Sequence, residues 1–206
     1  MDSLDALEEK LVWIFGSPRT GSSWLMRLLA EAREIHTINE TYLPLHLVPT
    51  GHRVKDGEYL EHGARADDPN FFFARRYLDE LRPELRQLIL RGLERQFREL
   101  GGRPDHRWIL VKEPNGSHAA DTTLSLLPKS RLVFLLRDGR DVIDSLIDAM
   151  LGEETWWKNV RRTASTPDPD RLRFIRQHAR LWVHRTESVQ RAFRSLPDDD
   201  RFLLRV

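Results

Sequence analysis

Three short apolar runs constrain the fold of this chain more than any other feature. They are residues 11–15 (LVWIF), 108–111 (WILV) and 131–136 (RLVFLL). Each is rich in β-branched or aromatic residues and shows no polar alternation, which is typical of strands buried on both faces. The first and third runs lead into turn residues and then into apolar residues at helical spacing. Strand–turn–helix units of this kind predict a three-layer α/β fold, with a central parallel sheet flanked by helices.

The rest of the chain divides into one long irregular stretch and two long helices. Residues 41–70 are rich in Pro, Gly, His and Asp, and we expect a loop that shapes a functional site. Residues 71–100 have apolar residues on one side of a helix, which Pro83 should kink or split. A second helix is predicted at 171–194 and a last strand at 201–206. A single domain over residues 1–206 is the simplest arrangement.

Composition excludes several functional classes. The 206 residues are 40% hydrophobic, enough for a core, and 33 basic against 32 acidic residues give a net charge of +1. No global field therefore attracts nucleic acid or a membrane surface. The absence of cysteine excludes disulfides, zinc–thiolate sites and cysteine nucleophiles. With an acidic N-terminus and no apolar run long enough to span a bilayer, we expect a cytoplasmic globular protein.

The segment after the first run, residues 16–23 (GSPRTGSS), has the features of an anion-binding loop. Its glycine spacing matches the Walker A phosphate loop, but Ser22 stands at the lysine position. Such a loop points backbone N–H groups at an anion where a helix begins, and Gly21 permits the turn. Arg19 can bind two anion oxygens at once. A plain strand-to-helix turn capped by serine is the alternative interpretation.

The sequence SPRTGSSW in this loop resembles the 5′-phosphosulfate loop of sulfotransferases. These enzymes transfer a sulfuryl group from 3′-phosphoadenosine 5′-phosphosulfate (PAPS), leaving adenosine 3′,5′-bisphosphate, and they need no metal. The resemblance implies a P-loop NTPase-like form of the α/β fold. It also implies that the cofactor-binding residues include Ser17, Pro18, Arg19, Thr20, Gly21, Ser22, Ser23 and Trp24.

A second anion site is predicted at the end of the third run. Arg137 ends that strand, and Ser145 lies eight positions later in the following helix. In sulfotransferases an arginine and a serine at this spacing hold the 3′-phosphate of the cofactor, which the resemblance implies here. An arginine can donate two hydrogen bonds to a phosphate, and a serine can add an uncharged donor. Asp138 and Asp141 are expected to be structural, binding backbone N–H groups and pairing with Arg140.

Sulfuryl transfer requires a base that accepts the proton of the acceptor, and Glu40 is our first candidate. It follows a possible short strand at residues 35–38, and Thr41 comes next. Tyrosylprotein sulfotransferases have a catalytic glutamate followed by threonine at the matching place. Without the resemblance, Glu40 reads as a surface carboxylate. His36 and His118 are weaker candidates, and no histidine pair has the spacing of a zinc site, so no metal is predicted.

Lys112 and Glu113 end the middle strand and are the remaining candidates for catalytic residues. Cytosolic sulfotransferases carry a catalytic histidine just after a lysine in this place. The Lys112-Glu113-Pro114 sequence is closer to the Lys-Asp-Pro of the tyrosylprotein branch. The resemblance implies that Lys112 meets the sulfuryl oxygens or the leaving phosphate. Glu113 is the second candidate for the base, or a group that orients Lys112.

The resemblance covers roughly residues 9–150. Family members usually continue beyond a strand like that at 202–206 with a lid over the 3′-phosphate, so we expect that the C-terminal part of the usual domain is missing. Trp156 and Trp157 either shield a ligand or belong to a packed helix. The acceptor stays open among small molecules, phenols, glycans, lipid headgroups and tyrosyl peptides, and the lack of a signal argues against a Golgi setting.

Two alternatives of other classes follow from the same residues. A P-loop nucleotide phosphotransferase would bind ATP and depend on Mg²⁺, but the loop lacks its lysine and no strand-end aspartate stands out to hold the metal. A non-catalytic nucleotide-binding module would bind adenosine 3′,5′-bisphosphate without transferring a group.

Overall fold

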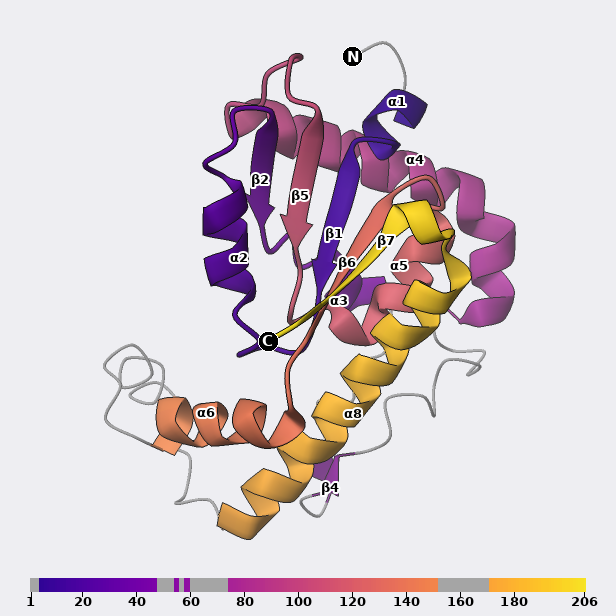
Figure 1. Cartoon of the computed structure of the whole chain (residues 1–206). Helices are drawn as coiled ribbons and strands as arrows, with labels where there is room; N and C mark the ends of the chain where they lie inside the picture. The colour runs from indigo at the N-terminus through magenta and orange to yellow at the C-terminus, as the bar shows by residue number, and fades with distance from the viewer. Residues whose placement is uncertain (1–3, 48–53, 56–57, 60–73, 152–170) are drawn as a thin grey trace.

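The computed structural model describes residues 4–47, 54–55, 58–59, 74–151 and 171–206. Its centre is a five-stranded sheet in the order β2-β5-β1-β6-β7, in which every neighbouring pair is parallel. A separate two-stranded antiparallel sheet pairs β3 with β4. Figure 1 shows the strands of the central sheet running in one direction, with α2 beside one face.

The elements have these bounds in chain order. The strands are β1 Leu11–Phe15, β2 Ile35–Asn39, β3 Val54–Lys55, β4 Glu58–Tyr59, β5 Trp108–Lys112, β6 Arg131–Leu136 and β7 Arg201–Arg205. The helices are α1 Leu4–Glu8, α2 Ser22–Leu29, α3 Leu43–Leu47, α4 Arg75–Glu99, α5 Ala120–Leu126, α6 Gly139–Leu151 and α8 Arg171–Ser195, with 3₁₀ turns η1 Ser117–Ala119 and η2 Asp198–Asp200. Within the described parts of the chain, no helix combines the length and apolarity that crossing a bilayer requires.

Helices cover both faces of the sheet, which explains why its strands lack polar alternation. Leu11, Trp13 and Phe15 of β1 point into a large core with residues of α1, α4, α5 and α8. Ile14, between them, points to the other face and packs with Leu25 of α2. Alternate residues of one strand therefore enter different cores, so the whole run must be apolar. The predicted three-layer α/β class is confirmed.

One local prediction was wrong, and another was wrong in part. The segment expected as a loop contains the short helix α3 and the β3–β4 hairpin. Pro44 is compatible with α3 because it stands in the first turn, where its missing N–H would have no helical partner. Pro83 does not split α4, which runs unbroken from Arg75 to Glu99. Residues such as Leu90 and Phe97 bury this helix against the sheet, and that packing outweighs the lost hydrogen bond. The predicted start of this helix at 71–73 lies outside the described residues.

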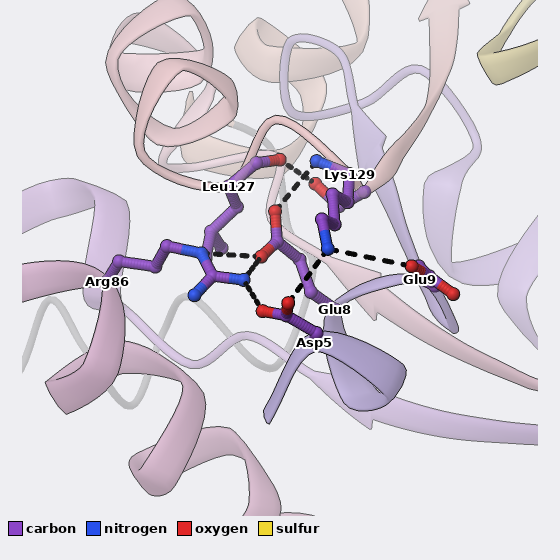
Figure 2. Close-up of polar contacts among 7 residues, drawn as sticks. Asp5, Glu8, Glu9, Arg86, Leu127 and Lys129 are labelled. Atoms are coloured by element: carbon purple, nitrogen blue, oxygen red, sulfur yellow. Dashed lines mark hydrogen bonds and ion pairs between the residues drawn. The ribbon is translucent and has the colours of Figure 1, made fainter. Parts of the chain in front are cut away.

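An ion cluster around the buried Glu8 fixes α1 to the amino end of the sheet (Figure 2). Glu8 is 0% exposed and accepts hydrogen bonds from Arg86 Nε at 2.7 Å and from the backbone N–H of Lys129 at 2.7 Å. Asp5 pairs with Arg86 as well, and it accepts from Lys129 Nζ at 2.9 Å. These two cations lower the pKa of Asp5, with the hydrogen bond from Lys129 the largest cause. The cluster therefore joins α1, α4 and the turn that precedes β6.

We predict that Glu8→Ala lowers the free energy of unfolding by about 3 kcal/mol, because Arg86 and the Lys129 N–H lose a buried partner. Glu9→Ala is the matched control: Glu9 is exposed and lies 3.7 Å from Lys129, so its loss should cost no more than about 1 kcal/mol. Urea unfolding of both variants measures the difference. Equal losses in the two variants would contradict the role given to Glu8.

Candidate functional site

The parallel sheet brings the predicted site residues to one edge. Because β1, β2, β5 and β6 run in the same direction, the segments that follow them leave the sheet at its carboxyl edge (Figure 1). These segments are the loop 16–23 after β1, Glu40 after β2, Lys112 and Glu113 at the end of β5, and Arg137 after β6. Open α/β sheets bind their ligands at this edge.

The first residue of the loop 16–23 is hydrogen-bonded to a buried serine. Ser117 Oγ accepts from the N–H of Gly16 at 3.0 Å and donates to the Gly16 carbonyl at 2.7 Å. Gly21 precedes α2 with φ of +85°, a conformation that glycine adopts without steric cost. No side chain caps α2 at this residue, so the N–H groups of its first turn have no side-chain acceptor there. The loop therefore keeps the geometry of an anion-binding turn.

Arg19 contacts both Arg137 and Ser145, and we term these three residues the arginine cluster. Arg137 Nη1 donates to the backbone carbonyl of Arg19 at 2.9 Å. Arg19 Nε donates to the hydroxyl of Ser145 at 2.9 Å. The two predicted anion sites are thus parts of a single cluster, in which the loop after β1 meets the segment that follows β6.

Lys112, Glu40, Ser23 and Asn115 form a second group, which we term the lysine cluster. Lys112 Nζ donates to Glu40 Oε1 at 2.7 Å and to Ser23 Oγ at 3.2 Å. Asn115 Nδ2 donates to the other oxygen of Glu40 at 3.0 Å. The Lys112 side chain is 4% exposed and that of Glu40 is 18% exposed, so Glu40 is the more accessible of the two. Ser23 belongs to the same loop as Arg19, which places the two clusters on either side of that loop.

Glu113 points away from Lys112 and contacts the turn after β2. Its Oε1 accepts from the hydroxyl of Thr41 and from the N–H of Tyr42, the latter at 2.9 Å. The residue is 0% exposed, and its Oε2 is buried without a hydrogen-bond partner. Burial raises the pKa of this carboxyl above its ordinary value, and the nearby charge of Glu40 adds to that effect.

Backbone strain is concentrated at this edge. In the described residues, the non-glycine residues with positive φ are Arg19 at +72°, Glu40 at +53° and Tyr42 at +58°. Each such conformation costs on the order of 1–3 kcal/mol and persists where surrounding contacts enforce it. All three belong to the loop 16–23 or to the turn after β2, so the strain lies where the candidate ligand contacts are.

The remaining predicted residues have less direct roles. Thr20 donates to the carbonyl of Ser17 at 2.8 Å within the loop, and both are buried together with Ser22. Trp24 on α2 is 64% exposed. Among the described residues, the loop is hydrogen-bonded to other parts of the site through Gly16, Arg19 and Ser23. Trp156 and Trp157 lie outside the described residues.

His36, His118 and Asp138 each have packing or hydrogen-bond partners near the site. His36 packs edge-on against Phe97 and lies beside His106, and burial lowers its pKa. His118 contacts the carbonyl of Asn115 at 3.2 Å through Nδ1. Asp138 accepts from the N–H and side chain of Arg140, and these bonds lower its pKa to about 2, as predicted for a structural carboxylate.

Sequence reasoning missed Asn115, Ser117 and the contact partner of Glu113. Asn115 lies three positions after Lys112, in the same strand-end segment, and that placement was the available signal. Ser117 carries no motif, and the Glu40-Thr41 pattern gave no contact for the Thr41 side chain. Their roles depend on which strands are neighbours in the sheet.

Comparison with known proteins identifies the type of fold. The family model of the sulfotransferase family matches residues 12–205. Among solved structures, a sulfotransferase from Alicyclobacillus acidocaldarius is 15% identical with a TM-score of 0.50, over 94% of this chain and 72% of that one. The sulfotransferase domain from the curacin biosynthetic pathway is 18% identical with a TM-score of 0.48, over 94% of this chain and 66% of that one. A search of curated proteins found no match.

The raised pKa of Glu113 predicts a pH dependence of stability. A carboxyl whose pKa is higher in the folded state binds a proton more tightly there than in the unfolded chain. Its contribution is therefore fully present below about pH 4.5, the ordinary value, and is lost as the pH rises through the folded pKa.

Glu113→Gln removes this titration. The free energy of unfolding of the wild type minus that of the variant should fall as the pH rises above about 4.5, by about 1.4 kcal/mol for each tenfold difference in proton affinity between the two states. Urea unfolding at several pH values measures it. A difference that is constant or rises with pH would contradict the prediction.

Proposed function

This chain belongs to the sulfotransferase family, and on that premise we propose that it transfers a sulfuryl group from PAPS to a hydroxyl or amine acceptor. The observation that carries the proposal is that Arg19 contacts both Arg137 and Ser145 at the carboxyl edge of the sheet. Two guanidinium groups and a hydroxyl at one place suit a ligand with more than one phosphate-type group. Adenosine 3′,5′-bisphosphate, the product of the reaction, has that chemistry.

The residues present fit such a cofactor. Arg137 and Ser145 bind its 3′-phosphate. The loop 16–23 binds the 5′-phosphosulfate through Arg19, Ser22, Ser23 and backbone N–H groups at the start of α2. The uncapped first turn of α2 supports this role, because its N–H groups need an acceptor. Trp24, exposed on the same helix beside the loop, offers a flat apolar surface on which a nucleotide base can stack.

The lysine cluster supplies the acid–base chemistry. Bound PAPS provides the sulfuryl group, whose bond to the 5′-phosphate oxygen breaks as a bond to the acceptor atom forms. Glu40 accepts the proton of the acceptor at its carboxylate. Lys112 has three N–H donors, of which two point to Glu40 and Ser23, so one is left for an oxygen of the transferring group. Glu40 and Lys112 are 2.7 Å apart. The carboxylate can therefore accept the proton of the acceptor while the ammonium binds an oxygen of the sulfuryl group.

The acceptor is a small molecule, a glycan or a peptide that carries a hydroxyl or an amine. Fixed cations rather than a metal meet the negative charge of the transfer, since Lys112, Arg19 and Arg137 all lie at the edge where it occurs. The domain extends through the whole chain from β1 to β7, the range over which the family matches.

We predict that Arg19→Ala and Arg137→Ala each weaken the binding of adenosine 3′,5′-bisphosphate by about 10- to 100-fold, the size expected for hydrogen bonds to a charged group. Arg140→Ala is the matched control, because Arg140 lies three positions from Arg137 and its side chain is 91% exposed and paired with Asp138. Isothermal titration calorimetry measures the three affinities. If all three variants bind like the wild type, the cofactor site is wrong.

Glu40→Gln should lower turnover by at least about 100-fold, because a general base contributes that much or more. The affinity for adenosine 3′,5′-bisphosphate should change by less than about threefold, since the variant leaves the arginine cluster intact. Turnover is followed as conversion of PAPS to adenosine 3′,5′-bisphosphate. A Glu40→Gln protein with normal turnover would remove Glu40 from the mechanism.

A further inference from the structure

The turn at residues 40–42 is in a conformation that its own residues do not favour. Glu40 and Tyr42 both have positive φ, at +53° and +58°, and neither is glycine, asparagine or aspartate. Side chains with a Cβ rarely adopt this region without support from outside the turn. The turn also places Glu40, the proposed base, in contact with Lys112 of the lysine cluster. What supports the turn therefore decides where the base points.

A single carboxylate oxygen supports it. Glu113 Oε1 accepts from the N–H of Tyr42 and from the hydroxyl of Thr41. The Thr41 oxygen in turn accepts from the N–H of Leu43 at 3.2 Å, where α3 begins. On the other side of the turn, the N–H of Glu40 donates to the carbonyl of Lys112 at 2.9 Å. Contacts from the end of β5 thus hold each residue of the turn.

The segment 112–115 acts as a template for Glu40. Lys112 and Asn115 contact the two oxygens of the Glu40 carboxylate, while Glu113 contacts the backbone and side chain of the turn. Pro114 lies between them and restricts the segment, because its ring fixes φ. The side chains on either side of Pro114 therefore keep a defined relation to one another.

We propose that Glu113 is a positioning residue, which holds the turn of residues 40–42 and so directs the Glu40 carboxylate toward the acceptor. The inference rests on the proposed function for its catalytic consequence, but the geometry can be tested without it. Glu113 is 0% exposed, and its Oε1 is occupied by Thr41 and Tyr42, so an acceptor reaches Glu40 and not Glu113. It does not orient Lys112, whose ammonium contacts Glu40 and Ser23.

Three variants separate positioning from proton transfer. Glu113→Gln keeps a carbonyl oxygen that can accept from Thr41 and Tyr42, but it removes the basic group. Glu113→Ala removes the acceptor. Thr41→Val removes one donor to Glu113 with little change of shape, and it keeps the test open if Glu113→Ala does not fold. Glu8→Gln is the matched control, since Glu8 is also 0% exposed but lies at the other end of the sheet.

Crystal structures of the variants and their turnover of PAPS to adenosine 3′,5′-bisphosphate, with water as acceptor, are the two readouts. We expect Glu113→Ala and Thr41→Val to move Glu40 away from Lys112 and to lower kcat by about 10- to 100-fold, with the affinity for adenosine 3′,5′-bisphosphate within about twofold of wild type. Glu113→Gln should keep Glu40 in place and lose less than about tenfold in kcat, and Glu8→Gln should alter the melting temperature rather than kcat.

Two results overturn the proposal. One is a hydrogen bond between Lys112 and Glu40 that is unchanged in the crystal structures of Glu113→Ala and Thr41→Val. The other is a Glu113→Gln protein that loses as much kcat as Glu113→Ala with Glu40 in place, which would make Glu113 the base. A wild-type protein that binds adenosine 3′,5′-bisphosphate but converts no PAPS, with water or with phenol, sugar and amine acceptors, would contradict the proposed function instead, and the structures alone would still decide whether Glu113 holds the turn.

Discussion

The hydrogen bond from Arg137 to the backbone carbonyl of Arg19 joins parts of the chain that are 118 residues apart. Arg19 is in a left-handed conformation, and its side chain reaches Ser145. The site therefore depends on a strained loop that is held by contacts from a different strand. Such a loop is already shaped before a ligand arrives, which lowers the ordering cost of binding.

The same loop also connects the arginine cluster to the lysine cluster. Ser23 contacts Lys112, and Lys112 contacts Glu40, so groups proposed to bind the cofactor and groups proposed to move the proton share hydrogen bonds. This arrangement follows from the strand order, which sets β1 between β5 and β6. The loop after the central strand is therefore flanked by the segments that end its two neighbours.

The fold class and part of the candidate site could be predicted from the sequence. Buried parallel strands leave non-alternating apolar runs, so the α/β class was predictable, and the sulfotransferase resemblance of residues 17–24 is confirmed by the family match. Arg137 and Ser145 are eight positions apart on one strand–helix unit, which local spacing can reveal. The convergence of Arg19 on Ser145 needed the structure, because sequence does not show which strands are neighbours.

The contacts of Glu113 and Asn115 could not be predicted from the sequence for the same reason. Their partners lie more than 70 residues away, in the turn that follows β2, and β2 pairs with β5 only in the folded sheet. Pro83 and the segment after Thr41 were misjudged because local composition was weighed without tertiary packing. Burial of α4 against the sheet offsets the cost of its proline, and no local pattern reports that burial.

The cations around Arg19 and Arg137 are proposed to hold opposite ends of one doubly phosphorylated adenosine. Thermal unfolding with equal concentrations of adenosine 3′,5′-bisphosphate, adenosine 5′-monophosphate and adenosine 3′-monophosphate tests it, because a ligand that binds the folded state raises the melting temperature. The account predicts a clearly larger rise with the bisphosphate than with either monophosphate, without added Mg²⁺. An equal rise with one monophosphate, or none with the bisphosphate, would contradict it.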